Sequence, residues 1–280
     1  MKFETTLTHI PRPIKGIVVC CFILTFFMVG CQKSQSLTPG ISSAVPFSPT
    51  PSPSPVKKPL TILFIGNSYT DLYFSIPQLF SELSKSGGHA VEIDVSAPGG
   101  WTLAQHSESQ NTEDIIRSKN WDYVVLQENG RIASNQNTCI DEILPVVKLI
   151  DKKIPAEETK LIFFMQWACR DGTSACGTRD FDETQAELQF CYENLANEMQ
   201  SLLAPVGVAW EKAVSQYPEL DVWHGDGIHA SNLGAYLGAC VFYSLLYQES
   251  PVGIPYTENL SAYEARSLQA IAAETVLEDP

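Results

Sequence analysis

From residue 60 onward, short apolar runs alternate with longer segments in which apolar residues recur every three or four positions. The short runs predict strands at 61–65, 90–95, 121–126, 160–167 and 206–210. The longer segments predict helices at 75–86, 112–118, 139–152, 181–203, 232–248 and 261–278. This alternation predicts an α/β fold, in which a parallel sheet is covered by helices on both faces.

The first part of the chain has a different pattern. Three basic residues precede an uncharged, mostly apolar run at 16–30, which is short for a membrane span and typical of a signal peptide. The run ends at Met28-Val29-Gly30-Cys31, which resembles a bacterial lipobox. We therefore expect residues 1–31 to be a lipoprotein signal peptide with Cys31 as the lipidation site. The alternative is an uncleaved N-terminal anchor with an incidental cysteine.

Residues 32–59 are dominated by Ser, Thr and Pro, with an uninterrupted Ser-Pro-Thr-Pro-Ser-Pro-Ser-Pro segment at 48–55. Such a segment buries too little apolar surface to fold and is expected to be an extended, semi-rigid linker. Residues 60–280 then form one domain of ordinary size. The predicted protein is exported and lipid-anchored to a bacterial membrane, with this domain facing the periplasm or the cell exterior.

The charge of the chain narrows the range of partners. It contains 18 Lys and Arg against 32 Asp and Glu, for a net charge of −14. Six of the basic residues but only one acidic residue precede residue 60, so the domain is more acidic still. This charge disfavours nucleic acid and anionic lipid as partners. It also disfavours polyanionic substrates, although a local site could override it.

The domain contains five cysteines: Cys139, Cys169, Cys176, Cys191 and Cys240. Cys169 and Cys176 bracket a short loop, which favours a disulfide in an exported protein; free buried cysteines are the alternative. The odd number leaves at least one thiol unpaired within the domain. No Cys-x-x-Cys pair occurs, which disfavours a zinc ribbon.

Two motifs carry candidate chemistry. Gly66-Asn67-Ser68 directly follows the first predicted strand, where open α/β sheets place their ligands. Asp226 precedes His229 by three residues, so its carboxylate can hold one ring proton while the other ring nitrogen takes a proton from a serine. Each motif alone also has a structural explanation: a capping serine in a turn, and an aspartate cap beside an incidental histidine.

Together with Gly99-Gly100 after the second predicted strand, these motifs resemble the SGNH/GDSL hydrolases, in that family's order and across most of the domain. The resemblance implies a three-layer α/β/α sandwich with a parallel, flavodoxin-like sheet and serine esterase or acyl-hydrolase activity. It implies that Ser68 is the nucleophile, His229 the general base and Asp226 its orienting acid. Gly100 (or Gly99) would donate a backbone N–H to the oxyanion hole beside the N–H of Ser68. No cofactor is expected.

The sequence departs from this family at the third motif, which is usually Gly-x-Asn-Asp and whose asparagine donates a side-chain N–H to the oxyanion. Here the third predicted strand ends in Gln127-Glu128-Asn129-Gly130. Gln127 emerges directly from the strand and is favoured as the third donor, with Asn129 as the second choice. Alternatively, both side chains only satisfy loop backbone.

Other polar and aromatic residues lie near these motifs. His106 could approach the cleft, although a position on a helix surface is favoured. His224 lies close to Asp226 and His229, but three ligands in one short loop give poor tetrahedral geometry, so no metal is expected. Three tryptophans near strand ends or the histidine loop could be platforms for sugar rings or could pack in the core: Trp101, Trp167 and Trp223.

Three functions agree with this pattern. The leading hypothesis is a serine esterase that hydrolyses short-chain O-acyl esters, such as carbohydrate-linked acetyl groups. The second is a non-catalytic surface module that binds glycans, motivated by the missing Gly-x-Asn-Asp. The third is an O-acyltransferase in which a sugar hydroxyl replaces water. The expected partners are therefore a small ester or acylated carbohydrate and a membrane through the lipid anchor only, without nucleic acid. The sequence leaves the oligomeric state undetermined.

Overall fold

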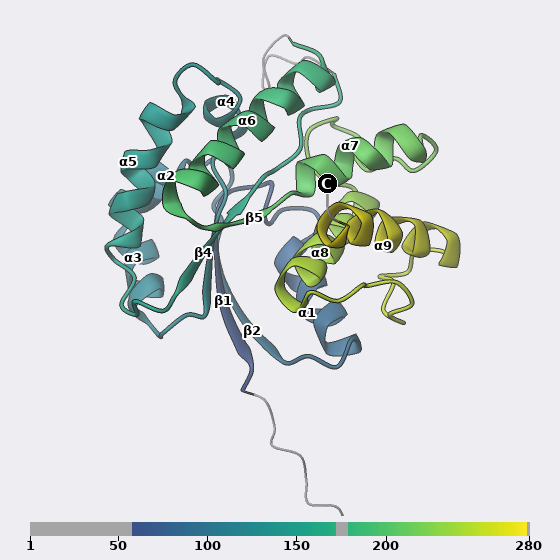
Figure 1. The fold of residues 1–280 in the computed structure, drawn as a ribbon, viewed down its shortest axis with the longest axis horizontal. Coiled ribbons are helices and arrows are strands. Elements are labelled where there is room, and N and C mark those ends of the chain that lie inside the picture. Colours follow the sequence, from purple (N-terminus) through teal and green to yellow (C-terminus); the bar gives the residue numbers. More distant parts are fainter. Residues whose placement is uncertain (1–57, 172–178, 279–280) are drawn as a thin grey trace, which may run out of the picture. The chain divides into compact units, whose positions relative to one another are not determined.

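The structure, a computed structural model, describes residues 58–171 and 179–278. In this part of the chain, five parallel strands form one sheet in the order β2-β1-β3-β4-β5 (Figure 1). The strands are β1 (Leu60–Ile65), β2 (Val91–Ser96), β3 (Tyr123–Leu126), β4 (Lys160–Phe164) and β5 (Leu202–Ala204). Because the chain leaves β1 for β2 on one side and then returns to β3 on the other, the strand order reverses beside β1. Ligands in such sheets bind at this reversal, outside the carboxyl ends of the strands.

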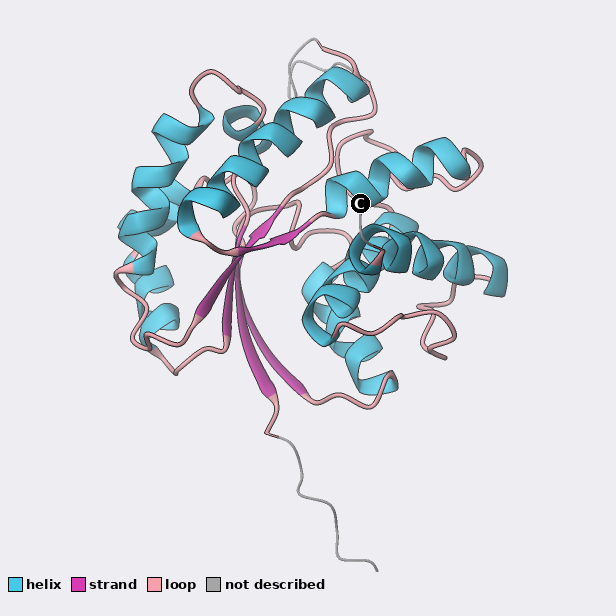
Figure 2. Ribbon diagram, viewed as in Figure 1, coloured by secondary structure: helices cyan, strands magenta, loops and turns pink. Residues whose placement is uncertain are grey.

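Helices cover both faces of the sheet (Figure 2). One layer contains α1 (Ile76–Ser86), α7 (Val206–Gln216), α8 (Asn232–Tyr247) and α9 (Ala262–Leu277). The other contains α2 (Leu103–Glu108), α3 (Gln110–Arg117), α4 (Gly130–Ala133), α5 (Cys139–Asp151) and α6 (Phe181–Met199). The predicted α/β/α sandwich with a parallel sheet is therefore confirmed.

The central strand β1 is buried on both faces. Ile62 and Phe64 pack into the core beneath α1 and α8, whereas Leu63 and Ile65 pack into the opposite core. This division follows from the two-residue period of a strand. Since β1 pairs with both β2 and β3, the residues that follow Ile65 emerge at the middle of the sheet's carboxyl edge.

The prediction of a strand at 206–210 is wrong. The last strand, β5, lies a few residues earlier, because Gln200 adopts a left-handed conformation (φ 49°) that ends α6. The apolar residues after Pro205 form α7 instead, and the buried ones recur at helical spacing. A short apolar run does not by itself distinguish a strand from a buried helix. The short helices α2 and α4 were not predicted.

One disulfide, Cys139–Cys191, joins α5 to α6. Cys169 is disulfide-bonded as well, and its expected partner Cys176 lies outside the described residues. Cys240 is a free, buried cysteine on α8, in agreement with the expected unpaired thiol.

The predicted signal peptide, Cys31 and the linker up to residue 57 lie outside the described residues. Within residues 58–171 and 179–278, no helix combines the length and the apolar character that a membrane crossing needs.

Candidate active site

The turn after β1 places Ser68 at the carboxyl edge of the sheet, where it is partly exposed. The side chain of Asn67 holds this turn. Its oxygen accepts the backbone N–H of Tyr69 at 3.1 Å, and its nitrogen donates to the carbonyl of Trp101 at 2.9 Å. An asparagine that bonds to the backbone two residues on is a common turn-forming arrangement. Asn67 therefore fixes the turn and ties it to the loop that follows β2.

His106 supports the same turn from below. It is 1% exposed, so it lies neither in the cleft nor on a helix surface as expected. Its Nε2 lies 2.7 Å from the carbonyl oxygen of Gly66, which can only accept, so this nitrogen carries the proton. Its Nδ1 then accepts the hydroxyl of Thr112 at 3.0 Å. Burial lowers the pKa of His106 and so favours the neutral ring; the hydrogen bond to Gly66 raises the pKa but is the smaller effect.

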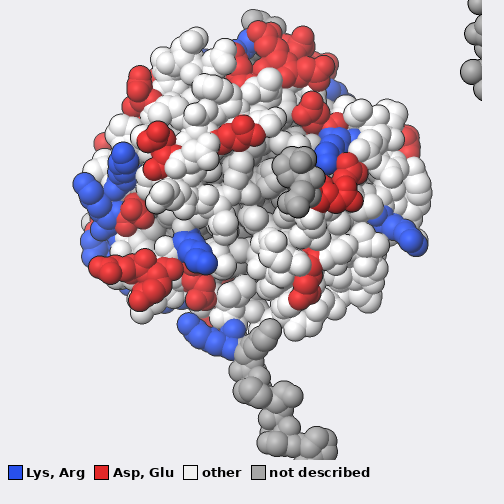
Figure 3. Space-filling view, viewed as in Figure 1, with Lys and Arg blue, Asp and Glu red and all other residues white. Residues whose placement is uncertain are grey.

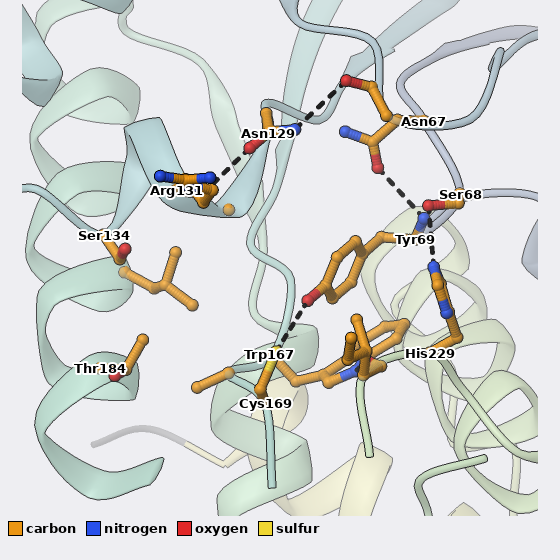
Figure 4. A pocket seen from close by; sticks show the side chains of 15 residues that line it. Asn67, Ser68, Tyr69, Asn129, Arg131, Ser134, Trp167, Cys169, Thr184 and His229 are labelled. Atoms are coloured by element: carbon orange, nitrogen blue, oxygen red, sulfur yellow. Dashed lines mark hydrogen bonds between the residues drawn. The ribbon is translucent and has the colours of Figure 1, made fainter. Parts of the chain in front are cut away.

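Ser68, His229 and Asp226 form one chain of hydrogen bonds, of which Figure 4 shows the bond between Ser68 and His229. Ser68 Oγ lies 2.9 Å from His229 Nε2, and His229 Nδ1 lies 2.8 Å from Asp226 Oδ2. Because a carboxylate accepts, Nδ1 donates its proton to Asp226 and leaves Nε2 free to accept the hydroxyl proton of Ser68. The structure thus brings the three residues of the two sequence motifs together in the order that activates a serine.

The carboxylate of Asp226 is fixed by its own turn. Its second oxygen accepts the backbone N–H groups of Ile228 at 2.9 Å and His229 at 3.0 Å. Burial raises the pKa of Asp226, but hydrogen bonds from the His229 ring and these N–H groups outweigh it and hold the pKa well below its usual range. Gly227, at φ 69°, supplies the left-handed residue that the turn needs.

Tryptophans hold the histidine loop against the end of β4. Trp167 donates its indole N–H to the carbonyl of Ile228 at 2.9 Å and stacks on Trp210 at 4.0 Å. Trp223 donates to the carbonyl of Ala168 at 3.1 Å. Both Trp167 and Trp223 are buried, so they pack beneath the loop and are not open platforms for sugar rings. Trp101, on the loop after β2, is partly exposed.

A pocket of about 210 Å³ opens beside Ser68 and His229. Ser68 and Gly100 both line it, and among the described residues their backbone N–H groups have no acceptor. Gly100 adopts φ 75°, a conformation that favours glycine. Two unpaired donors beside a serine hydroxyl can receive the oxygen of a carbonyl that the serine attacks.

The side chain of Gln127 is not in this pocket. It is 1% exposed, and its oxygen accepts the backbone N–H of Asn67 at 2.9 Å and the hydroxyl of Thr70 at 3.0 Å. Its nitrogen donates to the carbonyl of Glu128. The geometry therefore places Gln127 as a brace beneath the serine turn and does not support its expected place among the oxyanion donors.

Asn129 does line the pocket. Its Nδ2 lies 3.3 Å from the carbonyl of Gly100, and its second N–H has no acceptor among the described residues. Its oxygen accepts the N–H of Arg131 at 3.1 Å and so caps α4. The geometry therefore favours Asn129 over Gln127 as the third donor.

Glu128 is a functional candidate that the sequence analysis missed. It is 2% exposed, and its carboxylate accepts the backbone N–H of Leu103 at 3.2 Å and that of Asn129 at 2.5 Å. Burial raises its pKa to about 7 despite these hydrogen bonds. An acidic residue in the second position after a buried strand was the available signal, but the resemblance assigns no role to this position.

His224 lies beside Asp226. Its Nδ1 is 3.4 Å from Asp226 Oδ2, and its ring stacks on Tyr73 at 4.0 Å. Across residues 58–171 and 179–278, no group of three His, Cys, Asp or Glu side chains is placed to hold a metal ion. The arrangement of His224 is that of a ring packed between Tyr73 and the carboxylate of Asp226.

Solved structures share this three-layer fold, among them proteins proposed to be SGNH or GDSL-like hydrolases. A DUF4886 family protein from Bacteroides uniformis matches with a TM-score of 0.68 at 18% identity, over 79% of this chain and 95% of that one. A protein from Slackia heliotrinireducens, proposed to be an SGNH hydrolase, matches with a TM-score of 0.55 at 24% identity, over 66% and 97%. A protein from Parabacteroides merdae, proposed to be a GDSL-like lipase, matches with a TM-score of 0.51 at 19% identity, over 66% and 94%. At these identities the similarity shows the fold.

The chain belongs to the DUF4886 family, whose sequence model matches residues 101–275 and is described as a domain of unknown function. The matched range contains Asn129, Asp226 and His229 but begins after Ser68. No curated protein matches the sequence.

Proposed function

We propose that this protein is a serine hydrolase that cleaves O-acyl esters, with Ser68 as nucleophile, His229 as general base and Asp226 as the acid that orients His229. One observation carries the proposal: Ser68, His229 and Asp226 are joined by hydrogen bonds of 2.9 and 2.8 Å beside two unpaired backbone N–H groups. The SGNH-hydrolase fold supports it. A protein that only binds glycans, without catalysis, would not need these hydrogen bonds between Ser68, His229 and Asp226.

In the proposed mechanism, Ser68 Oγ attacks the ester carbonyl carbon while its proton passes to His229 Nε2. Asp226, whose pKa is held below its usual range, stays ionised and stabilises the imidazolium. His229 then gives this proton to the oxygen of the departing alcohol. A water molecule, activated by the same ring, releases the acyl group from Ser68.

The negative charge that develops on the carbonyl oxygen needs donors that are already in place. We assign this role to the backbone N–H groups of Ser68 and Gly100 and to the side-chain amide of Asn129. Each lines the pocket, and each has an N–H without an acceptor among the described residues. One such donor typically contributes about 3–4 kcal/mol to the barrier reduction.

The size of the pocket favours a short acyl group, because about 210 Å³ holds only a small ligand. An O-acyl carbohydrate remains the proposed natural substrate, on the strength of the predicted export. Transfer of the acyl group to a sugar hydroxyl would use the same residues, and analysis of the products with an added sugar acceptor distinguishes it from hydrolysis.

The test is labelling of the full-length protein with a fluorophosphonate, followed by mapping of the modified residue and by an acetyl-ester assay. Ser68→Ala should lose both labelling and turnover. The matched control is Ser215→Ala, which changes an exposed serine on α7 that does not line the pocket and should retain labelling and turnover. Equal labelling or equal turnover by Ser68→Ala and wild type would overturn the proposal.

We also propose that Cys31 is acylated and anchors the protein to a membrane. Two or more acyl chains on one cysteine give stable anchoring, since each buried CH₂ contributes roughly 0.8 kcal/mol. Mass spectrometry of the N-terminal peptide should find an acylated Cys31, and Cys31→Ser should release the protein from the membrane fraction. An unmodified wild-type peptide that begins before Cys31 would contradict this.

A further inference from the structure

We infer that the pocket contains an anion subsite centred on Arg131, and that the preferred substrate is an ester bearing a carboxylate close to the bond that is cleaved. The inference rests on the proposed function, because it names the substrate class of the same pocket. The carboxylate belongs either to the acyl group or to the alcohol, and the experiment below distinguishes the two.

Arg131 lines the same pocket as Ser68 and His229. It lies on α4, the single turn of helix that begins directly after Asn129. Figure 4 shows Arg131 and Ser134 on one side of the pocket, with Ser68 and His229 on the other. A small molecule whose ester contacts Ser68 therefore extends across the pocket toward the guanidinium.

Arg131 is exposed at the mouth of the pocket, and its guanidinium has no partner within the described part of the chain. No carboxylate lies within ion-pair distance of it, and no hydrogen bond of its side chain is formed there. Three other arginines are paired in the described part of the chain: Arg117 with Glu113, Arg170 with Asp221 and Arg179 with Glu187. Arg266 is unpaired there as well, but it does not line this pocket. The planar guanidinium presents five N–H donors in a fork that matches a carboxylate, so an unpaired one in a pocket suits an anionic ligand.

The lining of the pocket is unusual for so acidic a protein. The chain carries 32 acidic residues against 18 basic ones, yet none of the described residues that line the pocket is Asp or Glu. Figure 3 shows acidic side chains gathered near the upper end of α6. Asp182 and Glu183, in the first turn of α6, are exposed; neither lines the pocket and neither pairs with Arg131.

The absence of acidic side chains from the described lining of the pocket limits the expectation that the acidic domain disfavours anionic substrates. The acidic surface repels extended polyanions, whereas a small monoanion that fits within the pocket meets one positive side chain and no negative one. The local site that could override the overall charge is thus present at Arg131.

Two hydroxyl groups complete the subsite. Ser134 and Thr184 line the same pocket and are 3% and 6% exposed, respectively. Neither hydroxyl has a hydrogen-bond partner among the described residues. Neither oxygen is among the fully buried unpaired ones, so both are accessible from the pocket and can donate to a ligand that accepts hydrogen bonds. Together with Arg131 they offer donors to both oxygens of a carboxylate.

The experiment compares matched esters that differ only in charge, with the full-length protein at pH 8. Ethyl hydrogen succinate and ethyl succinamate differ on the acyl side, and 3-acetoxybenzoate and 3-acetoxybenzamide differ on the alcohol side. The variants are Arg131→Gln and Arg131→Lys. The matched control is Arg266→Gln, which removes the same charge from an exposed position on α9 that does not line this pocket.

In the wild type, kcat/KM for the anionic member should exceed that for the neutral member in one of the two pairs, which identifies the side that carries the carboxylate. Arg131→Gln should reduce this ratio by about tenfold or more, since charge-assisted hydrogen bonds are about twice as strong as neutral ones. Arg131→Lys should retain part of the ratio, and Arg266→Gln all of it. A ratio unchanged by Arg131→Gln, or a wild-type preference for the neutral member of both pairs, overturns the inference.

A binding measurement separates this inference from the proposed function. Calorimetric titration of Ser68→Ala with ethyl hydrogen succinate and with 3-acetoxybenzoate should detect binding of one of them. The same titration of Ser68→Ala/Arg131→Gln should show its loss. If no ester is hydrolysed by the wild type, the proposed function fails, yet the anion subsite is still decided: equal affinities of the two variants, or no binding to either, refute it.

Discussion

The carboxylate of Glu128 accepts the backbone N–H of Leu103 at 3.2 Å and so joins the loop after β3 to the loop after β2. Asn67 makes a comparable link from the loop after β1, through its bond to the carbonyl of Trp101. The three loops that carry the proposed oxyanion donors are therefore fixed to one another by side chains. Donors fixed before the substrate arrives need no reorganisation during the reaction, which is the condition for strong electrostatic stabilisation.

Glu128 should make the stability of the protein depend on pH. Burial raises its pKa to about 7 from an ordinary value of 4.5, so between these values the folded state keeps a proton that the unfolded chain has lost. Its contribution to the free energy of unfolding is therefore greatest below pH 4.5 and falls as the pH rises to 7. The amide introduced by Glu128→Gln does not titrate. The free energy of unfolding of this variant, relative to that of wild type, should therefore increase between pH 4.5 and 7 by up to roughly 3 kcal/mol.

Urea unfolding of both proteins at a series of pH values from 4.5 to 8 measures this difference. A difference in unfolding free energy that stays constant across the series would contradict a raised pKa for Glu128.

Asp226→Asn should lower kcat by roughly 10³–10⁴ with little change in KM, because it removes the charge that stabilises the imidazolium of His229. Since the pKa of Asp226 is held well below its usual range, the carboxylate is ionised from mildly acidic pH upward. Its contribution to stability is therefore lost only as the pH falls through the acid range. Steady-state kinetics on an acetyl ester measures the loss, with Asp182→Asn as a surface control. Activity within a few fold of wild type would remove Asp226 from the mechanism.

Asn129→Ala and Gln127→Ala should affect different properties: the first mainly catalysis, the second mainly stability. Asn129→Ala removes a proposed oxyanion donor and should lower kcat by about 10²–10³. Because the side chain of Asn129 also caps α4, the free energy of unfolding should fall by about 1 kcal/mol. Gln127→Ala leaves the N–H of Asn67 and the hydroxyl of Thr70 without their acceptor. It should lower the free energy of unfolding by roughly 2–3 kcal/mol. Kinetics and urea unfolding of both variants test the contrast, and the reverse pattern would make Gln127 the donor.

Gly66→Ala should destabilise the protein and impair catalysis together. A Cβ at this position would collide with Thr70 Oγ1 and lie 2.6 Å from Gln127 Oε1, so the serine turn must shift. Such overpacking typically costs about 1–3 kcal/mol. Gly99→Ala is the matched control, because a Cβ there meets nothing within 4 Å. Thermal unfolding and the acetyl-ester assay measure both effects; equal behaviour of the two variants would show that the close packing at Gly66 is dispensable.

The fold could be predicted from the sequence where an element is long or buried on both faces. The run at 61–65 and the periodic segments that became α1, α5, α8 and α9 have patterns that few alternatives share. The end of the sheet could not be predicted, because β5 has three residues and the apolar run after it belongs to α7. Propensity and periodicity carry little information over so short a span.

The candidate site, too, could be predicted only in part. Ser68, Asp226 and His229 stand in short motifs whose chemistry depends on local spacing, and the structure brings them together. The choice between Gln127 and Asn129 depends on how the chain turns after β3, which the order of residues does not disclose. Glu128 and Arg131 belong to no motif; their significance comes from burial in one case and from an absent partner in the other, and both are properties of the folded chain.

The indole of Trp167 lines the pocket, bonds to the residue before His229 and stacks face to face on Trp210. Indole emission is sensitive to nearby polar groups and to changes in stacking. Binding of a ligand beside Ser68 should therefore change the intrinsic tryptophan fluorescence. Occupancy of the pocket can then be followed without any label and without turnover.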